Sequence, residues 1–224
     1  VAADEAQVDQ QIRNREKQVN DMIAKMQAEA IAKQKEEPRK KEEAKKKEEP
    51  QAAQQQKPSQ KPTPGGSQKP TPGHTQKPKP PKNETPFVDQ VSGFSYPLPS
   101  SYRRINSPYG TRTHPVTGKP NFHTGIDLPA PKNTRITAVK SGIVSISGYN
   151  ASYGNYIVIQ HTDGYSSLYG HMNSRAVGAD DVVSQGQLIG YVGATGSATG
   201  NHLHLEIRKG GSRINPAGCF PGLS

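Results

Sequence analysis

The 224-residue sequence predicts an all-β antiparallel domain over residues 87–224, preceded by a helical segment and a disordered proline-rich linker. All nine Tyr and all four Phe lie from Phe87 onward. That part consists of short β-rich runs separated by Gly, Asn, Asp, Pro and Ser turns, a rhythm typical of a sandwich or barrel-like fold. Proline recurs every second to fourth residue in much of the stretch 50–86, which helices do not tolerate. The C-terminal part is long enough to bury one core.

Residues 1–49 form the predicted helical segment, which is coiled-coil-like up to about Ala32. Five apolar residues have the 4-3 spacing of an a/d seam, which Arg15 interrupts. They are Val8, Ile12, Val19, Met22 and Met26. The seam is short and lacks Leu, so two interpretations stay open. One is a dimerisation element that gives weak self-association through residues 1–32. The other is a mostly solvated helix or the remnant of a longer coiled coil. The alternating Lys/Glu block at 36–49 is expected to be fully solvated.

Residues 50–86 are the predicted linker. They contain a near-exact repeat of Gln-Lys-Pro-Thr-Pro-Gly, which favours extended polyproline conformations and a semi-rigid cationic spacer. His74 lies in this linker and is not expected to be a ligand.

The remaining residues, 87–224, read as strands and turns. Short β-rich runs are expected at 134–139, 142–147, 155–161, 165–169, 187–192 and 202–207. No convincing amphipathic helix interrupts them. The single cysteine, Cys219, cannot form an intramolecular disulfide and is expected to be a small buried hydrophobe.

The net charge of +10 bears on the class of partner. Residues 1–86 carry 18 Lys/Arg against 13 Asp/Glu, and residues 87–224 carry 11 against 6, so each part is near +5. Such a balance favours nucleic acid, anionic membrane surfaces or polyanionic wall polymers. Without an Arg-rich recognition helix or an aromatic RNA-binding signature, nucleic acid is not expected. No apolar run approaches a transmembrane span, and no signal-peptide core is present. The start at Val1 predicts a processed or trimmed product.

Four of the seven histidines lie in three short segments: His123, His171, His202 and His204. On a strand, His202 and His204 project to the same face, so one can bind a metal while its neighbour faces the substrate. Leu203, Leu205 and Ile207 would then enter the core. The alternative is that both histidines face solvent on a polar strand surface.

His123 and Asp127 would lie about 13 Å apart on a flat strand, so they converge only if the chain bends between them. Gly125, midway, permits such a bend. Two imidazoles and a carboxylate are a normal ligand set for catalytic zinc with one open position. Hydrolysis then needs a base and an oxyanion donor, roles that His171 and the non-ligating member of the H-x-H pair can fill. His161 is expected to be structural, and His114 lies close enough in sequence to line the site.

Several segments occur in an order that resembles one family. They are Ser107–Gly118, Phe122–Asp127, Leu168–Met172, Gly186–Gly193 and Thr195–Glu206. The chain from about Ser107 to Pro216 is similar to the lysostaphin/LytM-type zinc metallopeptidases, which are bacterial peptidoglycan endopeptidases. The resemblance implies a two-sheet antiparallel fold with the site in a groove and one zinc ion per domain. It further implies that His123, Asp127 and His204 are the zinc ligands. His171 and His202 would be the catalytic pair that activates water and stabilises the tetrahedral intermediate.

The expected function is therefore that of a secreted zinc endopeptidase that cuts peptide stems or cross-bridges of bacterial peptidoglycan in the cell wall. The basic linker would attract the enzyme to anionic wall polymers. The alternative is a non-enzymatic wall-binding or hydrolase-activating module on the same fold. The sequence leaves the scissile bond open.

Overall fold

The computed structural model describes residues 2–46, 93–113, 118 and 120–223. The chain forms two compact units: Val1–Glu29 together with Phe87–Ser224, and Ala30–Pro86. The predicted linker at 50–86, His74 and His114 lie outside the described residues.

The helix α1 covers Ala2–Lys46 and carries Asp4 and Glu5 in its first turn, where acidic side chains complement the helix dipole. Its apolar residues Val8, Ile12 and Val19 are buried within the first compact unit. These residues belong to the predicted coiled-coil seam, and they contact the β-sheet of their own chain. Among the described residues, no helix is long and apolar enough to cross a membrane.

The strands of the first unit are short at the start and longer in the middle. They are β1 (Gly110–Thr113), β2 (Pro120–His123), β3 (Ile126–Pro129), β4 (Arg135–Thr137), β5 (Gly142–Asn150), β6 (Gly154–His161), β7 (Tyr165–Arg175), β8 (Val182–Val183), β9 (Leu188–Val192), β10 (His202–Lys209) and β11 (Ser212–Ile214). Two single 3-10 turns, η1 (Ser100–Tyr102) and η2 (Pro216–Cys219), flank them.

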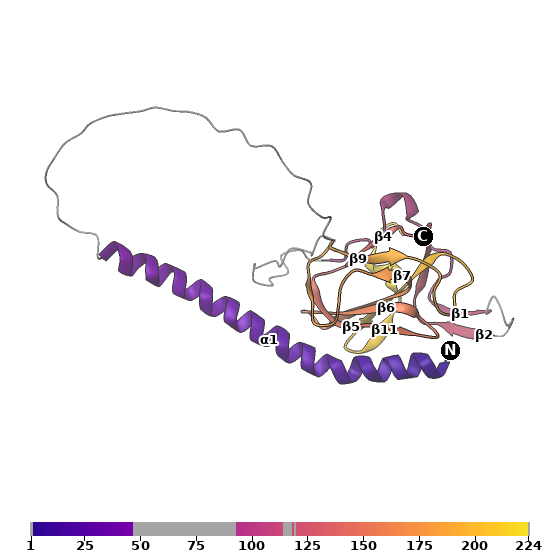
Figure 1. Ribbon diagram of the computed structural model, residues 1–224, viewed down its shortest axis with the longest axis horizontal. Coiled ribbons are helices and arrows are strands. Elements are labelled where there is room, and N and C mark those ends of the chain that lie inside the picture. Colours follow the sequence, from indigo (N-terminus) through magenta and orange to yellow (C-terminus); the bar gives the residue numbers. More distant parts are fainter. Residues whose placement is uncertain (1, 47–92, 114–117, 119, 224) are drawn as a thin grey trace, which may run out of the picture. The chain divides into compact units, whose positions relative to one another are not determined.

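The strands form two antiparallel sheets. β1 and β2 pair as a small sheet, and the larger sheet has the order β11-β10-β7-β6-β5-β8, with β3 beside β10 and β9 linking β4 to β7. Figure 1 shows β5, β6 and β7 side by side in this sheet. The predicted all-β, two-sheet antiparallel fold is confirmed, and each of the six predicted runs overlaps a strand.

The larger sheet is covered on both faces. On β6, Ile157 and Ile159 enter the main core, whereas Val158 packs with Val8 and Ile12 of α1. A strand buried on both sides needs apolar residues at successive positions, which explains why β6 reads as a continuous apolar run. Cys219 is half-buried against the main core, and burial raises the pKa of its thiol.

Candidate active site

Strand β10 places the H-x-H pair. Leu203, Leu205 and Ile207 are fully buried in the core, as the alternation predicted. On the opposite face, His204 is only 5% exposed and His202 is half-buried. The polar face of β10 is therefore not a solvated strand surface, which was the alternative interpretation.

A bend at Gly125 brings His123 and Asp127 to the same point. β2 ends at His123 and β3 begins at Ile126, where Asp127 pairs directly with His204 of β10. A Cβ at position 125 would lie 2.3 Å from the carbonyl oxygen of Leu205. Glycine is needed here because the turn approaches the β10 backbone more closely than any side chain allows.

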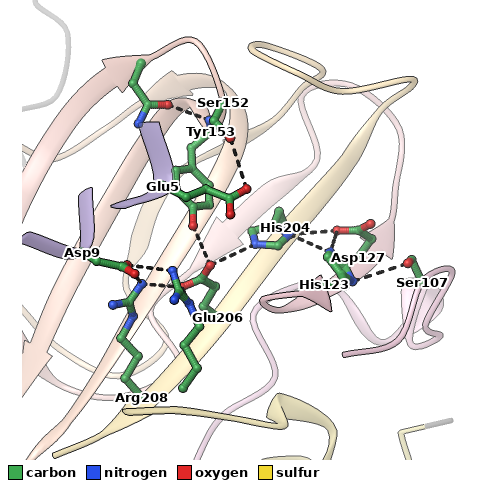
Figure 2. Close-up of polar contacts among 12 residues, drawn as sticks. Glu5, Asp9, Ser107, His123, Asp127, Ser152, Tyr153, His204, Glu206 and Arg208 are labelled. Atoms are coloured by element: carbon green, nitrogen blue, oxygen red, sulfur yellow. Dashed lines mark hydrogen bonds and ion pairs between the residues drawn. The ribbon is translucent and has the colours of Figure 1, made fainter. Parts of the chain in front are cut away.

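Three ligand atoms converge at this bend (Figure 2). His204 Nδ1 lies 3.0 Å from Asp127 Oδ1 and 3.2 Å from His123 Nε2, and His123 Nε2 lies 3.2 Å from Asp127 Oδ1. Ligands at about 2 Å from a tetrahedral ion are separated by roughly 3.3 Å, so the triangle fits a zinc ion. The three residues can hold one metal ion and leave a position for substrate or water.

The second nitrogen of His123 supports this assignment. His123 Nδ1 donates to the carbonyl oxygen of Pro108 at 2.9 Å, which leaves Nε2 without a proton and free to ligate. His204 points Nε2 toward Glu206 Oε1 at 3.5 Å and presents Nδ1 to the triangle. Both imidazoles are thus oriented by groups outside the triangle.

The electrostatics of the triangle favour a cation. Burial would raise the pKa of Asp127, but the adjacent imidazoles of His123 and His204 hold it well below its usual range. Burial would lower the pKa of His204, yet the carboxylates of Asp127 and Glu206 raise it to about 9. A proton on His204 is stabilised by the same negative charge that would stabilise a metal ion.

His171 enters the site from an irregularity in β7. Its backbone φ is +57°, in the left-handed region, where the β6–β7 register shifts. Such a bulge redirects a side chain, and this one points the imidazole toward β10, with ring centroids 4.7 Å from His202. His171 Nδ1 donates to the carbonyl oxygen of Thr195 at 2.9 Å, so Nε2 carries no proton. Burial, with smaller effects from His204 and His202, lowers the pKa of His171 to about 3.

His202 has the same tautomer. Its Nδ1 donates to the carbonyl oxygen of Gly200 at 2.9 Å, and its Nε2 lies 3.6 Å from Asp127 Oδ1. Burial lowers the pKa of His202. Both histidines are neutral near pH 7, and each has an Nε2 lone pair that can accept a proton.

The five predicted residues line one groove of about 1040 Å³. Phe122, which is 52% exposed, stands at its rim against Tyr109 with ring centroids 5.1 Å apart. Glu5 of α1 also lines the groove and accepts a 3.5 Å hydrogen bond from Ser152. A groove of this size can take a peptide segment.

The structure adds residues that the sequence analysis did not single out (Figure 2). Glu206 is fully buried behind His204 and accepts hydrogen bonds from Tyr153 Oη at 2.7 Å, Arg208 at 2.7 Å and Arg213 at 3.1 Å. Both arginines also donate to Asp9 of α1. We name Asp9, Glu206, Arg208 and Arg213 the ionic cluster. The sequence does contain one signal for two of these residues. The side chains of a strand alternate between its two faces, so Glu206 and Arg208 of β10 lie on the same face as the histidines.

His161 lies apart from the groove lining. It is buried, with Nδ1 bonded to the carbonyl oxygen of Ser141 at 2.9 Å and Nε2 bonded to Ser167 Oγ at 3.0 Å. These contacts support the structural role that its place at a strand end predicted.

Comparison with known proteins identifies the family. Residues 121–216, which carry His123, Asp127, His171, His202 and His204, match the description of peptidase family M23. Residues 121–216 are therefore a peptidase family M23 domain. The chain is 42% identical over 129 residues to the DD-carboxypeptidase/endopeptidase Mpg of Neisseria meningitidis serogroup B, covering 58% of the chain and 30% of that relative.

Two further similarities agree with this assignment. The chain is 43% identical over 119 residues to the peptidoglycan DD-endopeptidase ShyC of Vibrio cholerae, covering 53% of the chain and 28% of the relative. The crystal structure of a zinc-containing peptidase from Vibrio cholerae superposes with a TM-score of 0.52 at 34% identity, covering 55% of the chain and 39% of that structure. The chain spans about 30% of the length of the curated relatives it matches.

Proposed function

We propose that this chain is a zinc-dependent endopeptidase that hydrolyses peptide stems or cross-bridges of bacterial peptidoglycan, acting in the cell envelope after secretion. The observation that carries the proposal is the convergence of His123, Asp127 and His204 at the floor of a groove that also holds two neutral histidines. Two relatives are named a DD-carboxypeptidase/endopeptidase and a peptidoglycan DD-endopeptidase, and these names favour a D,D peptide bond as the scissile bond.

One zinc ion would be held by His123 Nε2, Asp127 Oδ1 and His204 Nδ1, whose separations and orienting contacts fit a tetrahedral site. When bound, zinc supplies the Lewis acidity that makes water acidic near neutral pH and polarises the scissile carbonyl.

His171 and His202 would carry out the proton transfers. Each has its Nδ1 proton fixed on a backbone carbonyl, so each presents an unprotonated Nε2 to the groove. One imidazole accepts a proton from the attacking water. The resulting imidazolium carries a proton on Nε2, so it stabilises the tetrahedral intermediate and then donates that proton to the leaving amine. The second histidine, whose Nε2 is an acceptor, would orient the attacking water by accepting a hydrogen bond from it. The rings are close enough to act on a single peptide unit, with centroids 4.7 Å apart.

The test is hydrolysis of purified walls by the full chain loaded with one equivalent of zinc. Peptidoglycan of several chemotypes should release new amino termini, and mass spectrometry of the products should identify the bond. His204→Ala should lose both zinc and activity. His202→Ala should keep zinc and lose turnover by about 10²–10⁴-fold.

Asp180→Asn is a suitable control because Asp180 forms an exposed ion pair with Arg15 away from the groove. The proposal is rejected if the zinc-loaded wild-type chain binds walls of every chemotype without releasing amino termini. That result would support the alternative, a wall-binding or hydrolase-activating module.

A further inference from the structure

The Nε2 side of the His204 ring, which points away from the proposed ligand triangle, faces the carboxylate of Glu206. His204 Nε2 is buried without a hydrogen-bond partner, and Glu206 Oε1 lies 3.5 Å away (Figure 2). Because Nδ1 faces Asp127 and His123, Nε2 is the nitrogen through which the protein can orient this imidazole. The position and charge of Glu206 therefore bear directly on the strength of Nδ1 as a ligand.

Glu206 is in turn held within the ionic cluster. Its Oε2 accepts from Arg208 Nη2 at 2.7 Å and Arg213 Nε at 3.1 Å, while Tyr153 Oη binds Oε1 at 2.7 Å. The Glu206 side chain is 0% exposed and that of Arg208 is 4% exposed. Charges buried this deeply must be compensated nearby, since an unpaired buried ion is strongly unfavourable.

The compensating charge comes from the N-terminal helix. Asp9 Oδ1 accepts from Arg208 Nη2 and from Arg213 Nη2, each at 2.7 Å. Two carboxylates and two guanidinium groups then make the ionic cluster neutral. The apolar contacts of Val8 and Ile12 with the sheet lie on either side of Asp9 and fix the helix at this point.

We infer that Asp9 is a positioning residue for His204, acting through the arginine–glutamate part of the ionic cluster. The inference rests on the proposed zinc site. Without the Asp9 charge, two guanidinium groups face one carboxylate and draw its negative charge toward Oε2. Oε1 then stabilises His204 Nε2–H less, and Nδ1 becomes a weaker ligand. The helix α1 is thereby a functional part of the metal centre, although its sequence lies far from every metal-binding motif.

A purely structural role for Asp9 would make a different prediction. It would anchor the helix and change stability without changing metal binding. The exposed pair Arg15–Asp180, at 2.8 Å, joins the same helix to the sheet domain and does not touch the ionic cluster. Loss of that pair should reproduce an anchoring effect alone.

The experiment measures zinc affinity of the full chain by competition with a chromophoric chelator, and the visible spectrum after Co²⁺ substitution. Glu206→Gln should weaken zinc binding by about 10–100-fold, and Asp9→Asn by roughly 3–10-fold, with an altered Co²⁺ spectrum. Asp180→Asn should leave both unchanged. Asp9→Glu, which restores the charge, should recover most of the affinity.

A double variant makes the route testable even if Glu206→Gln lowers stability. In the Glu206→Gln background, Asp9→Asn should add little further loss, since both act on the same contact. The inference is overturned if Asp9→Asn binds zinc as tightly as Asp180→Asn, or if its effect is undiminished in that background. If the wild-type chain itself fails to bind zinc, the proposed function fails instead.

Discussion

At the scale of single residues, the site depends on where each imidazole keeps its proton. His123, His171 and His202 each donate Nδ1–H to a backbone carbonyl, at 2.9 Å in every case. The main chain therefore fixes three tautomers without using any acidic side chain. His204 differs because it presents Nδ1 to the triangle and has a carboxylate behind it.

The depressed pKa of His171 predicts a pH dependence of stability in the metal-free protein. Its folded pKa of about 3 lies below the unfolded value of 6.5, so only the unfolded chain gains this proton as the pH falls. Stability is therefore present above pH 6.5 and is lost toward pH 3. At pH 5 the loss should be about 2 kcal/mol.

Urea denaturation at pH 7 and pH 5, with zinc removed by a chelator, measures this contribution. His171→Asn is the suitable comparison because Asn tolerates the left-handed backbone at this position. The variant should lose about 2 kcal/mol less than the wild type between the two pH values. Equal losses in both proteins would contradict the expected pKa of His171.

At the scale of elements, the junction between β2 and β3 determines whether the ligands meet. Gly125→Ala should destabilise the domain by about 1–3 kcal/mol or more, because its Cβ would meet the Leu205 carbonyl of β10 and the backbone cannot yield without breaking the β3–β10 pairing. Zinc affinity should fall together with stability.

Thermal denaturation and chelator competition check this expectation. Gly218→Ala is the matched control, since a Cβ there meets nothing within 4 Å. If both alanine variants melted and bound zinc alike, the close approach at Gly125 would not be what positions Asp127.

The elements also explain what could be predicted from the sequence. Alternation and turn residues are local signals, so the runs that became β5, β6, β7 and β10 were found, and Gly125 marked the bend. The strands β1, β2 and β3 were not predicted, because four-residue segments such as Pro120–His123 have no clear apolar alternation. For Glu206, the alternation of β10 indicates only that the side chain lies on the same face as the two histidines. Glu206 is buried against Arg208 and Arg213, and both arginines also bind Asp9, almost 200 residues away in the chain from Arg208. No local pattern contains contacts of this kind.

At the scale of the whole molecule, the apolar residues of α1 pack against a different partner in the structure from the one that the coiled-coil spacing predicts. In a coiled coil, Val8, Ile12, Val19 and Met22 would face a second helix. In the structure, Val8, Ile12 and Val19 are buried against the sheet of their own chain, Ile23 joins them, and Met22 is 37% exposed. The two arrangements therefore differ in which residue is buried at this turn of the helix: Met22 in a coiled coil, and Ile23 in the structure.

Two alanine variants of the full chain decide between these partners. Ile12→Ala removes a side chain that is 3% exposed, so it should cost about 2–4 kcal/mol and lower the melting temperature by roughly 5–10 °C. Met22→Ala should change stability by less than about 0.5 kcal/mol, because its side chain is largely outside the contact. Sedimentation should give the same mass for both variants and the wild type. A Met22→Ala chain that dissociated from a dimer, with Ile12→Ala no less stable than wild type as a monomer, would instead place these residues in a coiled-coil seam.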